Sequence, residues 1–287
     1  MTAPFVLLGG VNTVAATPPD EAHINIRENL KRGLLRLHCL PEFKKVKGPD
    51  SAIAIVGGGP SLKRHLDELR AFEGRMIACG SVHDFLIENG FKPRYAAACD
   101  PDPIMANYLR KPCSETTYLL SSHCHASAFD ALDGMPIVLW HCAPIDEKFL
   151  EEVDPGWQAV GGGCTVGLRA ISIAMMMGYS NIHLFGFDSS LEDDDHHSYG
   201  FSDKSEELGH VYTVKIGVGL DGPDAESKEF RCAGYQMAQA SHFKILLEHY
   251  SAFFTPTFHG DGLLPSMWRS IKSESDRLEK ESKEQAA

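Results

Sequence analysis

The stretch Ile53-Ala54-Ile55-Val56-Gly57-Gly58-Gly59-Pro60-Ser61-Leu62 decides the expected fold. Its four apolar residues predict a short buried strand, its three glycines a tight turn, and Pro60 with Ser61 the first residues of a helix. Glycines let a backbone come close to a ligand, and free N–H groups at a helix start attract an anion such as phosphate. A plain strand-to-helix turn is the alternative, because neither a P-loop lysine nor a complete GxGxxG pattern is present.

Further apolar runs of strand type alternate with stretches of helical character after this turn. Strands are expected at 51–57, 75–79, 94–99, 116–121, 136–140 and 181–187, and helices near 61–72, 81–90, 102–110, 125–132 and 164–178. This alternation predicts an α/β fold that is Rossmann-like, with a mostly parallel sheet and helices on both faces.

The chain divides into three expected parts. Residues 1–48 form an N-terminal helical segment and linker, with a helix over 24–39; residues 49–260 form a Rossmann-like catalytic core; and residues 261–287 form a charged C-terminal tail, frayed or disordered from 270 onward. The polar residues 191–228 predict a long active-site loop, because structureless loops of this length in a compact domain are usually functional or disordered.

Composition and charge restrict the partners. The 287 residues carry a net charge of −12, so the whole-chain field repels phosphate backbones and we expect no nucleic-acid partner. A nucleotide would need a local site built from backbone N–H groups or a bound cation.

Eight cysteines without a CxxC pair favour free thiols in the cytoplasm. No apolar run approaches the ~18–20 residues of a membrane helix, and the apolar start has no preceding Lys or Arg, which argues against a signal peptide. Homo-oligomerisation stays open.

Polar residues follow several of the expected strands, where parallel α/β sheets bind their ligands. Gly80 and Ser81 follow the second strand, Asp100-Pro101-Asp102 the third, and Gly186-Phe187-Asp188 the last. Asp100 and Asp102 predict a site for a divalent cation or for ribose hydroxyls. The alternative is that one of them only caps the following helix.

Two more groups of residues have chemical potential. The second glycine loop, Gly161-Gly162-Gly163-Cys164-Thr165, opens a helix that Thr165 can cap, and the loop could form a second anion cradle. Asp188 with His196, His197 and Tyr199 could bind a metal or act in acid–base chemistry, since histidine titrates near neutrality. Zinc at His123-Cys124-His125 is less expected, because no second pair has ligand spacing.

Three blocks, in order, resemble the MptE-like 6-hydroxymethylpterin diphosphokinase family. They are residues 56–62, residues 89–101 and residues 178–188, and the resemblance covers about residues 50–200. It implies a Rossmann-like core that transfers diphosphate from ATP to a pterin hydroxymethyl group with Mg²⁺. The core is also similar to that of Maf-type flagellin glycosyltransferases and, more remotely, of sialyltransferases that use CMP-sugars, so the fold does not choose the reaction. Phe187 stands where the family pattern has Gln.

Three functions therefore stay open. A diphosphokinase would hold nucleotide phosphates on Gly58, Gly59 and Ser61, position Mg²⁺ with Asp100, Asp102 and Asp188, and use His196 or His197 at the acceptor hydroxyl. A glycosyltransferase would bind a CMP-sugar or other nucleotide sugar on the same loop, with a histidine of 191–199 as base and no required metal. A non-catalytic nucleotide-binding protein is the third.

We expect a transferase for a small-molecule acceptor, with diphosphate transfer first. The predicted cofactor-binding residues are Gly57, Gly58, Gly59, Pro60, Ser61, Gly80, Ser81, Gly162, Gly163 and Thr165, and the predicted catalytic residues are Asp100, Asp188, His196 and His197.

Overall fold

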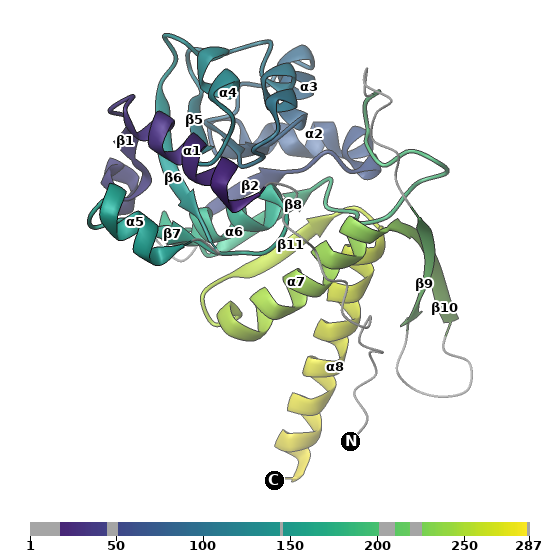
Figure 1. Ribbon diagram of the computed structural model, residues 1–287. Coiled ribbons are helices and arrows are strands. Elements are labelled where there is room, and N and C mark those ends of the chain that lie inside the picture. The colour runs from purple at the N-terminus through teal and green to yellow at the C-terminus, as the bar shows by residue number, and fades with distance from the viewer. Residues whose placement is uncertain (1–17, 45–50, 144–145, 201–209, 219–225, 286–287) are drawn as a thin grey trace.

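A parallel β-sheet forms the centre of the computed structural model, which describes residues 18–44, 51–143, 146–200, 210–218 and 226–285 (Figure 1). The strand order is β1-β6-β5-β4-β3-β2-β8-β11, with β7 paired to β6 beside β1, and each of these pairs is parallel. The strands are β1 (Leu35–Arg36), β2 (Ala52–Val56), β3 (Met76–Cys79), β4 (Tyr95–Ala98), β5 (Thr117–Ser121), β6 (Ile137–Cys142), β7 (Ala159–Val160), β8 (Asn181–Phe185) and β11 (Thr255–His259). The predicted parallel sheet is confirmed.

The strand order reverses at β2. From β2 the chain builds β3 to β6 outward on one side, and β8 then returns to pair with the other side of β2. The loops after β2 and β8 therefore leave the sheet at adjacent positions. In doubly wound sheets this reversal point is where ligands usually bind.

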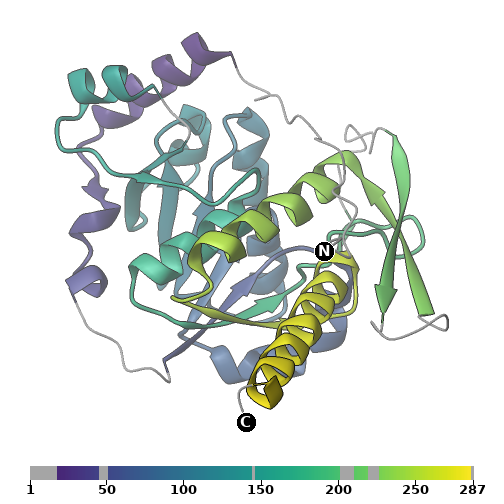
Figure 2. The ribbon, with the colours of Figure 1, turned by 90° about the horizontal axis from the view of Figure 1, so that it is seen from below.

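Helices cover both faces of the sheet, as predicted. One face carries η3 (Pro60–His65), α2 (Leu66–Leu69), η4 (Arg70–Phe72), α3 (Val82–Glu88), η5 (Pro103–Tyr108) and α4 (Ala126–Asp130). The other carries α6 (Val166–Met176), α7 (Gly234–Tyr250) and the start of α8 (Leu263–Gln285); Figure 2 shows α7 and α8 toward the viewer. Alternate residues of β2 face the two cores: Ile53 and Ile55 join the α6 and α7 side, and Ala54 and Val56 the α2 and α3 side.

The N-terminal segment differs from the predicted helix over 24–39. Helix α1 (Pro19–Leu30) ends early, Gly33 takes a left-handed φ of 65°, and β1 then joins the sheet beside β6. Of the leucines that suggested a longer helix, Leu30 ends α1, whereas Leu34, Leu35 and Leu37 all come after this turn. Short 3₁₀ helices η1 (Leu37–Cys39) and η2 (Pro41–Lys44) follow, and α5 (Glu147–Val153) lies on the same side of the molecule (Figure 1).

The prediction of a long loop over residues 191–228 is partly wrong. Residues 191–200 are irregular, but β9 (Val211–Val218) and β10 (Glu226–Ala233) form an antiparallel hairpin, and residues 201–209 and 219–225 lie outside the described residues. Val214, Ile216 and Phe230 form an apolar face of the hairpin that packs on the core, while charged residues alternate with them.

The segment predicted to be a charged C-terminal tail, residues 261–287, has its first residues in the core. Leu263, Leu264 and Met267 on the first turns of α8 are buried, and only the later part of α8 extends away from the sheet (Figure 1). Within the described ranges, no helix is long and apolar enough to cross a membrane.

Candidate functional site

The glycine loop after β2 and the loop after β8 pack directly on each other. The backbone N–H groups of Gly57 and Gly59 donate to the carbonyls of Phe185 and Gly186, at 2.8 and 2.9 Å. A Cβ atom on Gly59 would lie only 2.3 Å from Asp188 Oδ2 and 2.6 Å from the Gly186 oxygen. Glycine is therefore required here for the close approach of two backbones.

The carboxylate of Asp188 occupies the place where a phosphate was expected. Its Oδ2 accepts hydrogen bonds from the backbone N–H and the hydroxyl of Ser61, both at 2.9 Å. Asp188 is 4% exposed, and burial raises its pKa despite these two hydrogen bonds. The start of η3 thus has an acceptor from its own chain, so the contacts of Gly57, Gly59 and Ser61 give these residues a structural role in this conformation.

Residues 196–199, which we call the strap, lie across the same loop. The carbonyl of Gly58 accepts from Ser198 N at 2.9 Å and from His197 Nδ1 at 3.2 Å, and Ser198 Oγ donates to the Gly59 carbonyl at 2.7 Å. The rings of His197 and Tyr199 stack with an interplanar angle of 2°. A Cβ on Gly58 would lie 2.4 Å from the Tyr199 hydroxyl oxygen, so this glycine makes room for the strap. The structure places His197 against the loop, with His196 next to it, ring centroids 4.3 Å apart.

A cavity of about 230 Å³ opens beside the strap, between α3 and η5. Tyr199 forms part of its wall, with a hydrogen bond of 2.7 Å between its hydroxyl and Ser81 Oγ and with its ring stacked on Phe85 at 5.1 Å. The residues that line the cavity are Ser81, Asp84, Phe85, Glu88, Ile104, Asn107, Tyr108, Arg110, Lys111, Tyr199 and Gly200. Aromatic rings and two cationic side chains therefore line one cavity, which begins at Ser81, just after the carboxyl end of β3.

A hydrogen-bond network around the buried His83 fixes the cationic wall of this cavity. The carboxylate of Asp84 accepts from the backbone N–H groups of Arg110 and Lys111 at 3.0 and 3.3 Å, and it pairs with His83 Nδ1 at 2.7 Å. His83 Nε2 lies 3.1 Å from the hydroxyl of Tyr118, whose pKa burial raises to about 12. The turn that carries the two cations is therefore anchored to the core.

The three carboxylates predicted to share Mg²⁺ do not come together. Asp100 Oδ1 accepts from the N–H of Asp102, and Asp102 Oδ1 caps η5 through the N–H of Ile104, at 2.9 and 2.8 Å. Both are exposed at the end of β4, whereas Asp188 follows β8, three strand spacings or about 14 Å away. Mg²⁺ holds its ligands at about 2.0–2.1 Å, so one ion cannot bind all three in this arrangement.

The second glycine loop packs against α7. Thr165 caps α6 as predicted, accepting from the N–H of Leu168 at 3.4 Å. A Cβ on Gly163, whose φ is 110°, would lie 2.7 Å from Cβ of His242, and the N–H of Cys164 donates to His242 Nδ1 at 3.0 Å. A Cβ on Gly162, whose φ is 131°, would likewise lie 2.8 Å from the Leu168 carbonyl oxygen. These contacts explain the glycines by close packing.

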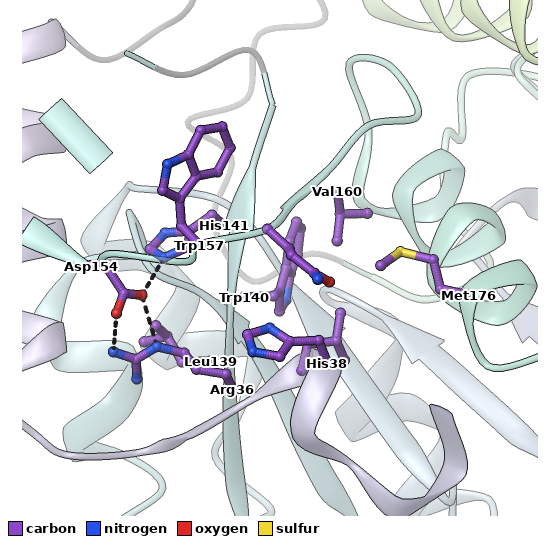
Figure 3. A pocket seen from close by; sticks show the side chains of 11 residues that line it. Arg36, His38, Leu139, Trp140, His141, Asp154, Trp157, Val160 and Met176 are labelled. Atoms are coloured by element: carbon purple, nitrogen blue, oxygen red, sulfur yellow. Dashed lines mark hydrogen bonds and ion pairs between the residues drawn. The ribbon is translucent and has the colours of Figure 1, made fainter. Parts of the chain in front are cut away.

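A second hollow lies at the far edge of the sheet, under β1 and β6 (Figure 3). Its volume of about 10 Å³ holds no more than one water, so it is not a substrate site. Beside it, His141 links Ser122 Oγ at 2.8 Å to Asp154 Oδ2 at 2.9 Å, and Arg36 pairs with both oxygens of Asp154. The order Ser-His-Asp is that of a hydrolase triad, but Ser122 is fully buried, and the chain of bonds ties β1 to β6.

Comparison with known proteins decides the family. The profile of the family described as 6-hydroxymethylpterin diphosphokinase MptE-like matches residues 24–194, more than half of the chain. The chain belongs to this MptE-like family. The matched segment includes the glycine loop, most of the cavity and Asp188, and it ends just before the strap.

The fold of this MptE-like chain also resembles a solved transferase structure. The MAf glycosyltransferase from Magnetospirillum magneticum AMB-1 superposes with a TM-score of 0.63 at 15% identity, over 88% of this chain and 38% of the other. The chain thus spans well under half the length of that protein, and the likeness confirms the Rossmann-like fold. No curated protein matches the chain in sequence.

Most of the cavity wall was missed by sequence reasoning. Ser81 and Tyr199 were singled out, but Phe85, Tyr108, Arg110 and Lys111 were not. Arg110 and Lys111 follow η5 in the crossover between β4 and β5, where no strand end marks them in the sequence.

Proposed function

We propose that this chain is a transferase with a nucleotide donor, and that it moves diphosphate from ATP to a hydroxymethylpterin-like acceptor. The observation that carries the proposal is the cavity between α3 and η5, which begins at Ser81, just after the carboxyl end of β3. The family to which the chain belongs is described as 6-hydroxymethylpterin diphosphokinase MptE-like. The proposed place of reaction is the cytoplasm, which suits a chain whose eight cysteines are all unpaired.

The side chains of the cavity suit a planar ring joined to phosphates. The stacked pair of Phe85 and Tyr199 offers an aromatic surface for a purine or pterin ring. Arg110 and Lys111 supply positive charge for phosphate oxygens, within a chain of net charge −12 that would otherwise repel them. Lys111 Nζ lies 2.6 Å from Glu88 Oε1, and a phosphate would compete with this exposed carboxylate for the ammonium.

Asp100 and Asp102 fit Mg²⁺ as a donor set. Both are exposed, their oxygens are hard ligands, and Mg²⁺ in phosphoryl-transfer sites is usually held by one or two carboxylates together with the substrate phosphates. When bound there, the ion would neutralise charge on the transferred phosphates. In this proposal Asp188 is a structural residue that holds the glycine loop, not a metal ligand.

The reaction is a displacement at phosphorus. The acceptor hydroxyl oxygen forms a bond to the β-phosphorus of ATP, the bond from that phosphorus to the α,β-bridging oxygen breaks, and AMP leaves. The protein contributes mainly positioning and charge. The strap histidines are the proposed groups near the acceptor proton; because His197 donates through Nδ1 to the Gly58 carbonyl, its Nε2 is the basic atom.

Glycosyl transfer from a nucleotide sugar is the second candidate. The fold likeness to the MAf glycosyltransferase over 88% of this chain favours it. The aromatic pair would then receive the nucleotide base, and the reaction would release a nucleotide without a required divalent cation.

The test is release of AMP. The chain is incubated with ATP, Mg²⁺ and reduced 6-hydroxymethylpterin, and we expect AMP only when all three are present. Replacing Arg110 and Lys111 together by alanine removes charged contacts of about 1.5–3 kcal/mol each and should lower kcat/KM at least about 100-fold, whereas Lys272→Ala, an exposed cation on α8, should not. Intact ATP together with cleavage of a CMP-sugar would reject diphosphate transfer in favour of the second candidate.

A further inference from the structure

Two histidines and a glutamate from distant parts of the chain meet beside the carboxyl end of β11. His65 ends η3, Glu68 lies on α2, and His259 is the last residue of β11. Nδ1 of His65 lies 2.9 Å from Glu68 Oε1, and Nδ1 of His259 lies 2.8 Å from Glu68 Oε2. Of the side chains that the structure describes, only these three form a group of His, Cys, Asp or Glu whose ligand atoms all lie within 4.8 Å of one another.

We propose that His65, Glu68 and His259 bind a divalent transition-metal ion, with Zn²⁺ as the preferred ion. Two imidazole nitrogens and one carboxylate oxygen suit Zn²⁺, which in open sites takes three protein ligands and leaves a fourth position for water or a ligand. Mg²⁺ and Ca²⁺ prefer oxygen ligands alone. Ligands held at about 2.0–2.2 Å in a tetrahedral site are about 3.4 Å apart. The present Nδ1 to oxygen separations would therefore widen by about half an ångström as the ion replaces the shared protons.

The surroundings of His259 provide a second observation for this site. Its other nitrogen, Nε2, lies 2.9 Å from Nδ1 of His183 on β8, and its ring stacks on Phe185 with centroids 3.8 Å apart and planes at 6°. A histidine that ligates a metal almost always donates its second ring N–H to a neighbour, which fixes its tautomer and orientation.

The site is open to solvent and separate from the proposed reaction cavity. The side chains of Glu68, His65 and His259 are 55%, 24% and 16% exposed, so an ion can enter and keep a water ligand. Its position is next to the strand-order reversal, because Gly260, which follows His259, abuts Ser61 Oγ: a Cβ there would lie 2.6 Å away. A metal at His65, Glu68 and His259 would thus join α2 to β11 beside the glycine loop. It would be distinct from Mg²⁺ at Asp100 and Asp102.

The competing interpretation is a purely structural bridge of hydrogen bonds between α2 and β11. Zn²⁺ titration of the chelator-treated full chain, with a chromogenic chelator as competitor, separates the two. We expect about one equivalent of Zn²⁺ bound with a Kd below about 1 µM. His183→Asn removes a partner of a ligand and should raise the Kd for Zn²⁺ about 10–100-fold. His65→Ala and Glu68→Gln each remove a ligand and should raise it at least as much. His249→Ala, an exposed histidine of α7, should leave Kd unchanged.

Two further readouts keep the test independent of activity and of folding. Co²⁺ bound in place of Zn²⁺ should give d–d bands without a thiolate charge-transfer band, which separates this site from the eight cysteines. Metal-free Glu68→Gln should unfold within about 1 kcal/mol of wild type, because the bridge is partly exposed. The proposal would be overturned if the His65→Ala, Glu68→Gln double variant still bound one equivalent of Zn²⁺ with the wild-type Kd. A wild-type Kd above about 100 µM would also overturn it.

Discussion

Gly59→Ala measures how closely the glycine loop packs on the loop after β8. The added Cβ would lie 2.3 Å from Asp188 Oδ2, 2.6 Å from the Gly186 oxygen and 2.9 Å from its carbonyl carbon. Gly59 has φ of −57°, which alanine adopts readily, so the cost comes from contact and not from backbone strain. Two of the three close atoms are backbone, and moving Asp188 away would weaken its two bonds to Ser61.

Overpacking of this kind costs about 1–3 kcal/mol, and a weakened charge-assisted bond adds about 1.5 kcal/mol. Alanine recovers about 0.4–1 kcal/mol by restricting the unfolded chain. The net loss in free energy of unfolding should be about 2–3 kcal/mol, and Tm should fall by about 4–12 °C.

The assay is urea unfolding of the ligand-free protein, followed by circular dichroism, with Gly161→Ala as the matched control. Gly161 opens the other glycine loop, and a Cβ there meets no heavy atom within 4 Å, so its variant should stay within about 0.5 kcal/mol of wild type. Suppose Gly59→Ala were as stable as wild type and lost only nucleotide binding. The loop would then be an open phosphate cradle, and the packing described above would be refuted.

Three other perturbations probe buried polar groups. Burial raises the pKa of Asp188 above its ordinary 3.8, so its contribution to stability is complete below that pH and is lost as pH rises through the folded pKa. The free energy of unfolding of wild type relative to Asp188→Asn should therefore fall as pH rises above 3.8 in urea titrations, and a difference that grows with pH would contradict this. Burial lowers the pKa of His141 below 6.5, so its contribution is complete above pH 6.5 and is lost on acidification; wild type should lose more stability than His141→Gln from pH 7 to 5, and parallel slopes would rule this out. Tyr199→Phe removes the hydrogen bond to Ser81 but keeps the ring stack, and it should lower the unfolding free energy by about 0.5–1.5 kcal/mol in thermal melts; no change would mean that this bond does not hold the strap.

The central strands were predictable because their signals are local. β2 to β6 are mostly apolar runs buried on both faces, as parallel strands are, and β8 is apolar except for the half-buried Asn181 and His183. These runs recur along the sequence between helical stretches. The hairpin β9–β10 was missed because Lys215, Glu229 and Arg231 make the segment polar, although Val214, Ile216 and Phe230 alternate with them. β11 was missed because Pro256 argues against a strand, yet β11 lies at the sheet edge where proline is tolerated.

The candidate site was less predictable, because its contacts join residues far apart in sequence. The pattern after β2 suggested free N–H groups for a phosphate, but Asp188, 127 residues after Ser61, already accepts from that helix start. The wall of the cavity depends on how α3 packs beside η5, which no local pattern encodes. His65 and Glu68 have the spacing of a helical pair, but only the pairing of β8 with β11 brings His259 to them.

Ligand-dependent stabilisation of the full chain tests the central claim, a nucleotide-dependent transferase that uses Mg²⁺ and ATP, most directly. Tm is measured with ATP, ADP, CMP, CTP, UDP, GDP and a CMP-sugar, each with and without Mg²⁺. A ligand at 100 times its Kd adds about 2.7 kcal/mol, which should raise Tm by about 5–10 °C. We expect this rise with ATP and Mg²⁺ together, and its loss when Arg110 and Lys111 are both alanine. A rise with CMP or the CMP-sugar that needs no metal, and none with ATP and Mg²⁺, would contradict diphosphate transfer.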